Sequence, residues 1–597
     1  MAKLRRVAVL LICLLSVKSA FAQGTCPANV PATGNHCYFM AANGADTNSG
    51  TSESSPWLHA PGMPNCSANC AAITPAPGNG FIFRGGDTWH FGNSSASPFT
   101  GGTWNWTYWN GSGTNCDTTD NPTPIRTSCI YIGVDPTWYS GSSWARPIMT
   151  GDNPASTTAV SRCAFPNVGT KDQFLLVQAS FVWVDNFEWT GMCSQTASSS
   201  SNNYLLGYDL YIWDLGCCGK MIQNIYSNNY AHGWTHVPFS CSEPGGEPIG
   251  ICESGGFISG GTSLSVLGPG NVCDGWDSDP TDVGCVGIGP AYIVYDNVFG
   301  NFAQIVVNSY HNWHDNYWFN YHPTGDGVAH GNEWEANTDA PGSDSNGNPQ
   351  PTVPFNAWYN NVQGHTASTA LGDMKVAFCP NTTAAEYWFN NIQYDQAGTG
   401  NTWDVATAGF NCTASGHIFM FNNTLDSPGA GALNCVGGMT VTGNHEIVEG
   451  SSAFGSGACT ISNEIKMTHA TAVSQGYMAT GKGTSGSNSN TTCANDATPC
   501  APTAATNSTV GAGPNLQGYC TALLRSSAPE IVRAGNACLY GTTDSCSYDS
   551  TTHTVICPRN GLVGRAASAA WDAGAYLFTG SPLQAPVPPT KLLATVQ

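Results

Sequence analysis

A short phrase built around asparagine recurs through the middle of the chain, and this repeat limits the possible folds more than any other feature. Each copy has two or three strand-forming residues, a polar residue, asparagine and another strand-forming residue. Several intervals between copies are 16 to 32 residues long. A repeat of this size predicts stacked coils rather than one closed globule. The copies contain Asn186, Asn229, Asn297, Asn316, Asn332, Asn361, Asn391, Asn423 and Asn444.

Asparagine suits such a repeat for two reasons. It tolerates the left-handed backbone conformation, so it can turn the chain sharply between two short strands. Stacked asparagine side chains can also form hydrogen bonds with one another along a column. The longer gaps, between Asn229 and Asn297 and between Asn332 and Asn361, leave room for a missed coil or an inserted loop.

The N-terminus has the three parts of a secretory signal. Lys3, Arg5 and Arg6 form a positive segment, residues 7–17 an apolar core, and residues 20–22 a small-residue cleavage site. The apolar core is too short to span a bilayer, and no later run approaches the roughly 20 apolar residues that a membrane span needs. We therefore expect a secreted or periplasmic protein, exported by a bacterium, without a membrane span.

The cysteine content fits an oxidising compartment. The chain has 25 cysteines, and 24 remain once Cys13 is removed with the signal. An even number in an exported protein favours disulfides, and the spacing of zinc ligands, such as CxxC, is absent. Three close pairs are expected to clip loops: Cys66 with Cys70, Cys273 with Cys285, and Cys493 with Cys500.

The charge balance restricts the possible partners. The signal holds four of the 18 Lys and Arg residues, which leaves 14 cationic side chains against 39 acidic ones. Nucleic acid is excluded because it needs clustered cations, and a polyanionic sugar would need metal ions. With 19 Trp and only 10% charged residues, the surface suits a neutral polysaccharide, since aromatic rings stack on sugar faces. Most of these rings are nevertheless expected to fill the coil interior.

Two phrases near the ends of the chain resemble those of a known superfamily. Residues 42–51, followed by residues 54–57, read close to G-x-D-x-N-S-G-T…S-P-W, and residues 571–576 read W-D-x-G-A-Y. Together with the asparagine repeat, they make the chain resemble the pectate-lyase-like superfamily of right-handed parallel β-helix proteins. The resemblance implies an all-β, three-sheet solenoid with long disulfide-clipped loops and asparagine at a tight turn between two sheets. Because the superfamily includes lyases, polygalacturonases, epimerases, tailspikes and adhesins, it leaves the function open.

The expected organisation follows from these features. Apolar and polar residues alternate in short runs, which indicates strands, and no sustained 3.6-residue stripe predicts a helix. Gly-, Ser- and Pro-rich stretches mark loops. We expect a signal at 1–22, an N-terminal cap and first coil at 23–80, a β-helix at 81–578 with loop insertions near 233–290 and 480–515, and a Pro-rich tail at 579–597.

Ionisable residues are densest between His311 and Asp339, where four of the 14 His residues lie. Two carboxylates beside a glycosidic bond could act as acid and as base or nucleophile, while histidines orient the sugar. The simpler interpretation makes them outward polar positions and turn acceptors. The catalytic candidates are Asp326, His330, Glu333 and Glu335, and the substrate-binding candidates are His314, His322, Trp318 and Trp334.

A lyase would instead need a base and a cation that neutralises a uronate carboxylate. Lys375, one or two coils beyond the histidine cluster, is the best single base, although a solvated or paired lysine is the simpler interpretation. Cations are scarce in the expected coils and loops: Arg126, Arg146, Arg162, Lys171, Lys220, Lys375, Lys466 and Lys482.

Calcium could supply the missing positive charge. Four carboxylates lie close together inside the expected Cys273–Cys285 clip, and hard oxygen ligands at short spacing suit Ca²⁺. An acidic surface loop is the alternative. The proposed ligands are Asp274, Asp277, Asp279 and Asp282.

Three functions therefore stay open. The chain could hydrolyse a polysaccharide with paired carboxylates, cleave it as a calcium-assisted lyase, or bind it without catalysis as an adhesion or structural surface protein. The sequence has no serine-hydrolase elbow, phosphate-binding loop or HExxH helix. The oligomeric state is not predicted.

Overall fold

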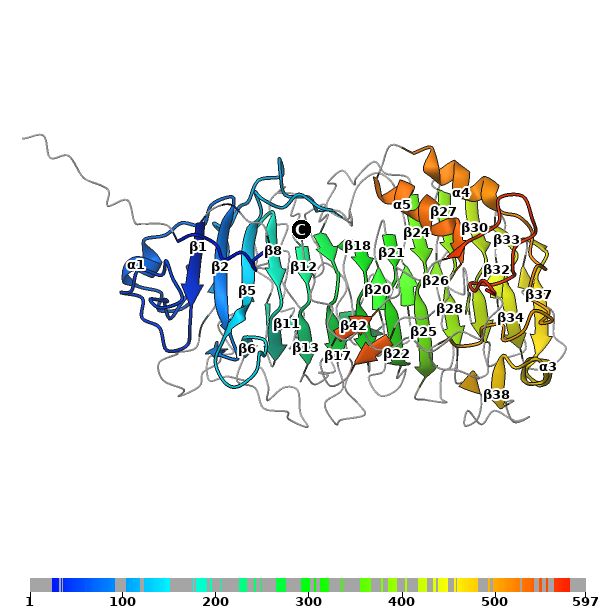
Figure 1. Ribbon diagram of the computed structural model, residues 1–597, viewed down its shortest axis with the longest axis horizontal. Coiled ribbons are helices and arrows are strands. Elements are labelled where there is room, and N and C mark those ends of the chain that lie inside the picture. Colours follow the sequence, from blue (N-terminus) through cyan, green and yellow to red (C-terminus); the bar gives the residue numbers. More distant parts are fainter. Residues whose placement is uncertain are drawn as a thin grey trace, which may run out of the picture.

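A computed structural model gives the structure of the chain (Figure 1). In the N-terminal part it describes residues 24–31, 34, 36–91, 102, 104–118 and 123–150. In the middle it describes residues 175–176, 179–190, 194–195, 204–205, 225–232, 241–242, 248–249, 265–274, 291–300, 305–307, 312–321, 334–336, 355–366, 377–378, 385–394, 403–404, 417–426, 433–435, 439–448, 456–457 and 459–480. Further on it describes residues 492–493, 498–526, 529–541, 547–549, 554–556 and 563–579.

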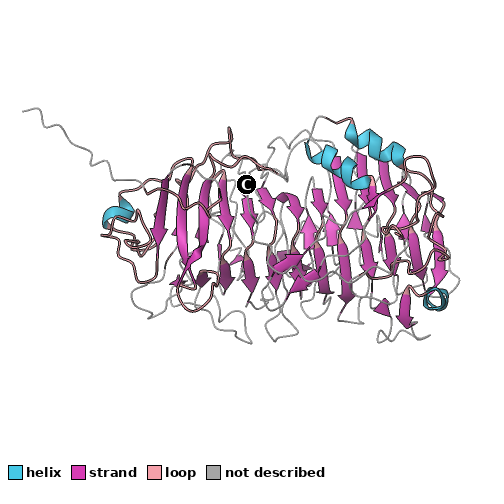
Figure 2. Cartoon of the chain, in the orientation of Figure 1, coloured by secondary structure: helices cyan, strands magenta, loops and turns pink. Residues whose placement is uncertain are grey.

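Two long parallel sheets run the length of the molecule (Figures 1 and 2). Sheet A has 13 strands: β1 (His36–Met40), β2 (Asn79–Gly85), β5 (Ile130–Tyr139), β8 (Val182–Asp185), β12 (Ile225–Ser227), β16 (Ser265–Leu267), β18 (Ala291–Tyr295), β21 (Asn312–His314), β24 (Phe355–Tyr359), β27 (Ala385–Phe389), β30 (His417–Phe421), β33 (Met439–Thr442) and β36 (Thr460–Ser462). Sheet B has 12: β3 (Thr88–His90), β6 (Ile148–Thr150), β9 (Glu188–Thr190), β13 (Tyr230–His232), β17 (Val272–Asp274), β19 (Val298–Gly300), β22 (Tyr317–Tyr321), β25 (Val362–Thr366), β28 (Ile392–Tyr394), β31 (Thr424–Asp426), β34 (His445–Val448) and β37 (Ile465–Thr468).

A third set of strands, which we call sheet C, completes the coils. Each of its strands precedes a sheet A strand, which a sheet B strand follows, so the chain winds through C, A and B in turn. Winding of this kind through parallel sheets is a β-helix, so the predicted three-sheet parallel β-helix is confirmed. The strands are β20 (Ile305–Val307), β23 (Trp334–Ala336) and β26 (Ala377–Phe378), which pair with one another, and β29 (Trp403–Asp404), β32 (Leu433–Cys435) and β35 (Ser456–Gly457), which form a second paired group.

Two successive residues form the corner between sheets A and B, and each has a different role. The first takes the left-handed conformation, as in Asn360 with φ 56° and Asp296 with φ 52°, and glycine does so at Gly270 and Gly443. The second is an asparagine, buried in the coils from β12 to β33. The predicted turn between two sheets is therefore confirmed, but the left-handed residue in these coils is the one before the repeated asparagine and not, as expected, the asparagine itself.

The second asparagines form a continuous amide ladder. Each Nδ2 donates to Oδ1 of the next asparagine at 2.9–3.2 Å. From Asn316 to Asn444, each Nδ2 also donates to a carbonyl two positions before the left-handed residue of the preceding coil. Both amide hydrogens are thereby satisfied in the buried interior. The ladder runs Asn229, Asn271, Asn297, Asn316, Asn361, Asn391, Asn423 and Asn444.

Three details of the repeat differ from expectation. Asn271 supplies the coil missing between Asn229 and Asn297, so strands β16 and β17 interrupt the stretch expected as one long insertion at 233–290. Asn186 occupies the left-handed position, with φ 70°, rather than the ladder position. Asn332 lies outside the described residues.

The interior of the solenoid is filled mainly by aromatic rings. The largest fully buried side chains are all tryptophans, so the expected interior role of these rings is confirmed for them. Stacked pairs such as Trp313 and Trp358, with centroids 5.6 Å apart, continue from coil to coil. These residues are Trp57, Trp89, Trp104, Trp106, Trp109, Trp189, Trp313, Trp318, Trp358 and Trp388.

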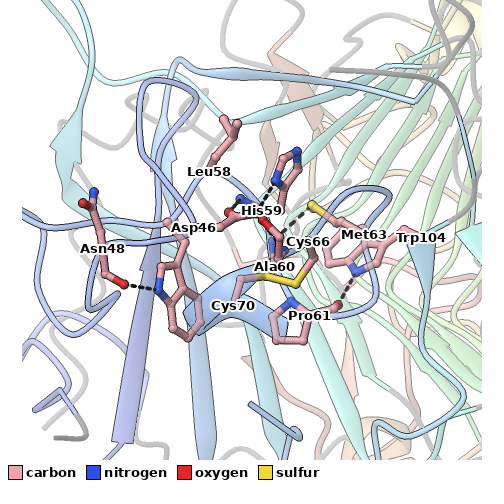
Figure 3. Close-up of a disulfide and its surroundings, with 12 residues drawn as sticks. Asp46, Asn48, Leu58, His59, Ala60, Pro61, Met63, Cys66, Cys70 and Trp104 are labelled. Carbon is pink, nitrogen blue, oxygen red and sulfur yellow. Dashed lines mark hydrogen bonds and ion pairs between the residues drawn. A yellow bond between two sulfur atoms is a disulfide. The ribbon is translucent and has the colours of Figure 1, made fainter. Parts of the chain in front are cut away.

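The opening phrase closes the N-terminal end of the solenoid (Figure 3). The Asp46 carboxylate accepts from the backbone N–H of His59 and of Ser67, both at 3.0 Å, and lies 2.9 Å from Nδ1 of His59. Trp57 donates from Nε1 to the Asn48 carbonyl and stacks on Tyr38 of β1. The adjacent loop carries the Cys66–Cys70 disulfide and the one-turn helix α1 (Ala68–Ala71).

The C-terminal part corrects the predicted extent of the β-helix. Among the described residues, sheet A ends at β36 and sheet B at β37, so the solenoid stops at Thr468. Helix α3 (His469–Gln475) follows, and α4 (Gln517–Leu524) and α5 (Pro529–Cys538) pack on sheet A at β24, β27 and β30 (Figure 1). These helices are too short to give a sustained helical stripe, so the sequence pattern did not predict them.

Five disulfides lie among the described residues. The predicted pairs Cys66–Cys70 and Cys493–Cys500 are confirmed, whereas Cys285 lies outside the described residues. The Cys520–Cys538 bond joins α4 to α5. The remaining two are Cys26–Cys37 and Cys116–Cys129.

Candidate functional site

Of the predicted catalytic residues, the structure describes Glu335 alone. Glu335 lies in β23, where its register partners are Val306 of β20 and Ala377 of β26. Glu333 and Lys375 are each two residues upstream of the paired positions Glu335 and Ala377. Asp326, His330, Glu333 and Lys375 lie outside the described residues, so their roles stay predictions.

The predicted substrate-binding residues divide into two groups. Trp334 lies in β23, next to Glu335, and His322 lies outside the described residues. Trp318 is 0% exposed and belongs to the interior core, between the rings of Phe299 and Trp358. A ring that fills the solenoid cannot stack on a sugar, so the expectation for Trp318 is corrected.

His314 is also packed rather than presented. It is 0% exposed, and its ring stacks between those of Tyr295 and Tyr359, at centroid distances of 5.3 and 4.7 Å. Its Nδ1 lies 2.7 Å from Oδ2 of Asp315. These contacts hold the imidazole against sheet A, which corrects the expectation that it contacts substrate.

Most of the proposed calcium loop lies outside the described residues. Asp274 ends β17, where it pairs with His232 of β13 and Gly300 of β19. Asp277, Asp279 and Asp282 lie outside the described residues. In the described ranges no group of three or more His, Cys, Asp or Glu residues could hold a metal ion. Calcium at this loop stays a prediction.

Sheet A also contains a buried polar cluster that the sequence did not predict. Asp185 of β8 accepts from the Tyr131 hydroxyl at 2.9 Å, the Ser227 hydroxyl at 2.7 Å and Asn228 Nδ2 at 2.8 Å. Burial raises the pKa of the Asp185 carboxyl, against the lowering effect of these hydrogen bonds. Because the four residues come from three neighbouring coils, only the strand stacking reveals the cluster, and its satisfied bonds indicate a structural role.

The arginines of the described coils are engaged by the protein. Arg84 makes two bonds to the Asp87 carboxylate, both at 2.9 Å. The Arg126 guanidinium lies 4.4 Å from the Trp183 ring centroid, and Arg146 donates to the Asn228 carbonyl at 3.0 Å. Arg126 and Arg146, two of the scarce cations, are therefore engaged by the protein itself rather than free to neutralise a uronate carboxylate.

The last coils contain ionisable groups in unusual surroundings. Glu464 ends the amide ladder, because its carboxylate accepts from the backbone N–H and Nδ2 of Asn444. Glu446 of β34 pairs with Leu425 and Lys466, is 0% exposed, and neither carboxylate oxygen has a hydrogen-bond partner. Burial, and then the nearby Glu464 charge, raise the pKa of Glu446 well above its ordinary 4.5, while Lys466 acts in the opposite direction.

We expect Glu446→Gln to stabilise the protein at neutral pH and not at acid pH. A carboxyl whose folded pKa is raised contributes stability below its unfolded pKa, near 4.5, and this contribution is lost as the pH rises through the folded pKa. Each unit of difference corresponds to about 1.4 kcal/mol. Denaturant unfolding at pH 4 and pH 8 measures the effect; an equal change at both pH values would contradict it.

Comparisons with known proteins do not assign the chain to a family. No protein-family model matches it, and no curated protein sequence does. Among solved structures, it is similar to a GH136 lacto-N-biosidase from Eubacterium ramulus, at 11% identity and TM-score 0.38, over 72% of this chain and 68% of that one. It is also similar to the pectate lyase Pel9A, at 13% identity and TM-score 0.35, over 92% of this chain and 97% of that one. A rhamnogalacturonan lyase matches at 12% identity and TM-score 0.29, over 72% and 87% of the two chains.

The described helices offer no candidate for a membrane span, because none of them is both long and apolar enough.

Proposed function

We propose that this chain is an exported carbohydrate-active protein that hydrolyses a polysaccharide bound along sheet C, with Glu335 supplying one catalytic carboxylate. The observation that carries the proposal is the register of sheet C. Glu335 pairs with Ala377, so Glu333 and Lys375 stand at equivalent positions two residues before this pair. Glu333, Glu335 and Lys375 are therefore proposed to act together.

We favour hydrolysis over elimination because two of the few described cations are engaged by contacts within the protein. A lyase must neutralise the uronate carboxylate, and Arg126 and Arg146 are held by the protein itself. Paired carboxylates need no such cation, because one protonates the glycosidic oxygen and the other activates water or attacks the sugar. Asp326 and Glu333 are candidates for the second carboxylate, and His330 and Lys375 for substrate orientation. Calcium-assisted elimination would require the Asp274–Asp282 loop to bind Ca²⁺.

The test incubates the mature protein with a panel of polysaccharides, with and without calcium. New reducing ends without ultraviolet absorbance from unsaturated uronides are expected and indicate hydrolysis. Reducing ends together with that absorbance would instead support the lyase. Retention on an insoluble glycan without any product would support the binding protein and overturn the proposal.

Glu335→Gln tests the proposed carboxylate directly. We expect it to lower the rate of cleavage by about 100- to 10,000-fold, the usual contribution of a general acid or base, without changing the unfolding temperature. The matched control is Glu386→Gln, which neutralises an acid on β27 of sheet A rather than on sheet C. Unchanged turnover in Glu335→Gln would remove this residue from the site.

A further inference from the structure

The last coil of the solenoid is exposed at the C-terminal end. Its strands β36 and β37 each pair on one side only among the described strands, with β33 and β34 respectively. All three residues of β36 are exposed. An interior row of sheet A runs through Trp358, Trp388, Met420, Val441 and Ile461. Val441 is 0% exposed and Ile461 is 38% exposed, so both the core and a free strand edge face outward here.

The opposite end of the solenoid is covered. The backbone N–H of Trp57 donates to the Phe39 carbonyl at 2.8 Å, and its carbonyl accepts from the N–H of Ala41 at 2.9 Å. The Trp57 ring stacks on Tyr38 at a centroid distance of 5.0 Å. The opening phrase therefore occupies the edge of β1 and covers the first core ring, whereas no described segment does the same at β36.

A lysine occupies an interior row of the exposed coil. Within sheet B, register pairing aligns Trp318, Gln363, Gln393, Leu425, Glu446 and Lys466. Trp318 and Leu425 of this row belong to the main core cluster, so the row faces the interior of the solenoid. A further coil stacked on the last one would bury the Lys466 ammonium, and burying a charge is costly unless it is paired and hydrogen-bonded.

The amide ladder also stops at this coil. Glu464 Oε2 accepts from the backbone N–H of Asn444 at 3.0 Å, and Oε1 accepts from Asn444 Nδ2 at 3.3 Å. An asparagine would offer its own Nδ2 to the next coil, as Asn423 does to Asn444, but a carboxylate has no N–H to offer. Burial raises the pKa of the Glu464 carboxyl well above its ordinary 4.5, so its charged form would become still more costly beneath another coil.

We propose that Lys466 and Glu464 keep the exposed last coil from pairing with the same coil of a second copy of this chain. Free strand edges are templates for pairing with other chains, and inward-pointing charged residues are one device that prevents it. A second copy is the partner that fits, because it presents the same free edge and the same exposed core row. Two identical edges related by a two-fold axis form a closed dimer. The proposal is independent of the proposed function.

The experiment compares the mature wild-type protein with the double variant Glu464→Asn, Lys466→Leu by size-exclusion chromatography with light scattering over a concentration series. Asparagine and leucine already occupy these two rows at Asn444 and Leu425, so the variant gives the last coil the residues of an interior one. We expect the mass of the wild-type protein to stay constant and that of the variant to increase about twofold with concentration. Amide exchange in β36 and β37 should become slower in the associated variant.

The matched control is Glu53→Asn with Arg525→Leu, which removes one acid and one cation from exposed positions outside the last coil. Its mass should stay constant, and association of this control would overturn the proposal by showing that loss of surface charge is enough. Constant mass in the folded double variant would overturn it as well. A wild-type protein whose β36 amides exchange more slowly at high concentration would show that the two residues do not prevent pairing.

Two further outcomes are decisive. Filaments in place of dimers would contradict the two-fold pairing, because the covered N-terminal end would then also take part. If the double variant failed to fold, Lys466→Leu alone, which leaves both bonds between Glu464 and Asn444 in place, should fold and associate more weakly. Constant mass in that single variant would overturn the proposal.

Discussion

Replacing Asn391 by leucine is expected to lower the free energy of unfolding by about 3–5 kcal/mol. Asn391 Oδ1 accepts from the backbone N–H of Asn361 at 3.0 Å and from Asn361 Nδ2 at 3.2 Å, while its own Nδ2 donates to the Trp358 carbonyl and to Asn423 Oδ1. Leucine leaves at least two of these buried groups without a partner, and each such group costs about 1–3 kcal/mol. Denaturant unfolding of the two proteins measures the difference.

The matched control for this prediction is Asn360→Gly, one coil earlier in the left-handed position. Asn360 has φ 56°, and glycine already occupies the equivalent corner position at Gly270 and Gly443. Glycine adopts this conformation without strain, and the change removes only the part-buried hydrogen bond from Asn360 Nδ2 to Asp315 Oδ1, so it should cost about 1 kcal/mol. A loss in Asn391→Leu no larger than that of the control would show that the amide ladder adds little to stability.

Replacing Arg565 by methionine is expected to release the C-terminal segment from the solenoid. The buried guanidinium donates to Asn390 Oδ1 at 3.0 Å and to the carbonyls of Asp572, Gly574 and Ala575 at 3.1–3.3 Å. It also lies 5.2 Å from the centroid of the Trp571 ring. Methionine fills part of the volume but leaves these acceptors unpaired, and breaking such a network costs about 3–5 kcal/mol.

Hydrogen exchange measures this effect locally. In Arg565→Met we expect faster amide exchange in residues 513–579, which include α4 and α5, with little change in residues 36–91 at the opposite end. The control is Arg525→Met, which removes an exposed arginine at the end of α4. Arg565→Lys should fall in between, because lysine keeps the charge but not the planar set of donors. Uniform exchange across the chain in Arg565→Met would contradict the local role.

The repeat predicted the architecture because its physics is local. A residue that can bend to positive φ, followed by a buried asparagine, defines one corner of a coil, and the same corner recurs from Asn229 to Asn444. The gap after Asn229 even indicated the missing coil at Asn271. The opening phrase was equally informative, since Asp46 and Asn48 hold the loop that closes the first coil.

The candidate site was only partly predictable. Of the five catalytic candidates from the sequence, the structure describes Glu335 alone, and the fold buries two of the substrate-binding candidates, Trp318 and His314. Successive strand residues point to opposite faces of a sheet. A cluster of histidines and tryptophans does not show which of them point into the core and which point to solvent.

The sequence by itself determined the winding of the chain, the asparagine corner and the disulfide clips at Cys66–Cys70 and Cys493–Cys500, because each depends on residues near one another in the chain or on a repeat of fixed form. Only the tertiary structure decided which residues of different coils became neighbours. It joined Asp185 to Tyr131 and Ser227, set Glu446 beside Lys466 in the last coils, and laid α4 and α5 over sheet A. The length of each loop sets how far apart in sequence stacked residues lie, and the loops here vary from coil to coil, so these contacts follow from strand pairing rather than from sequence spacing.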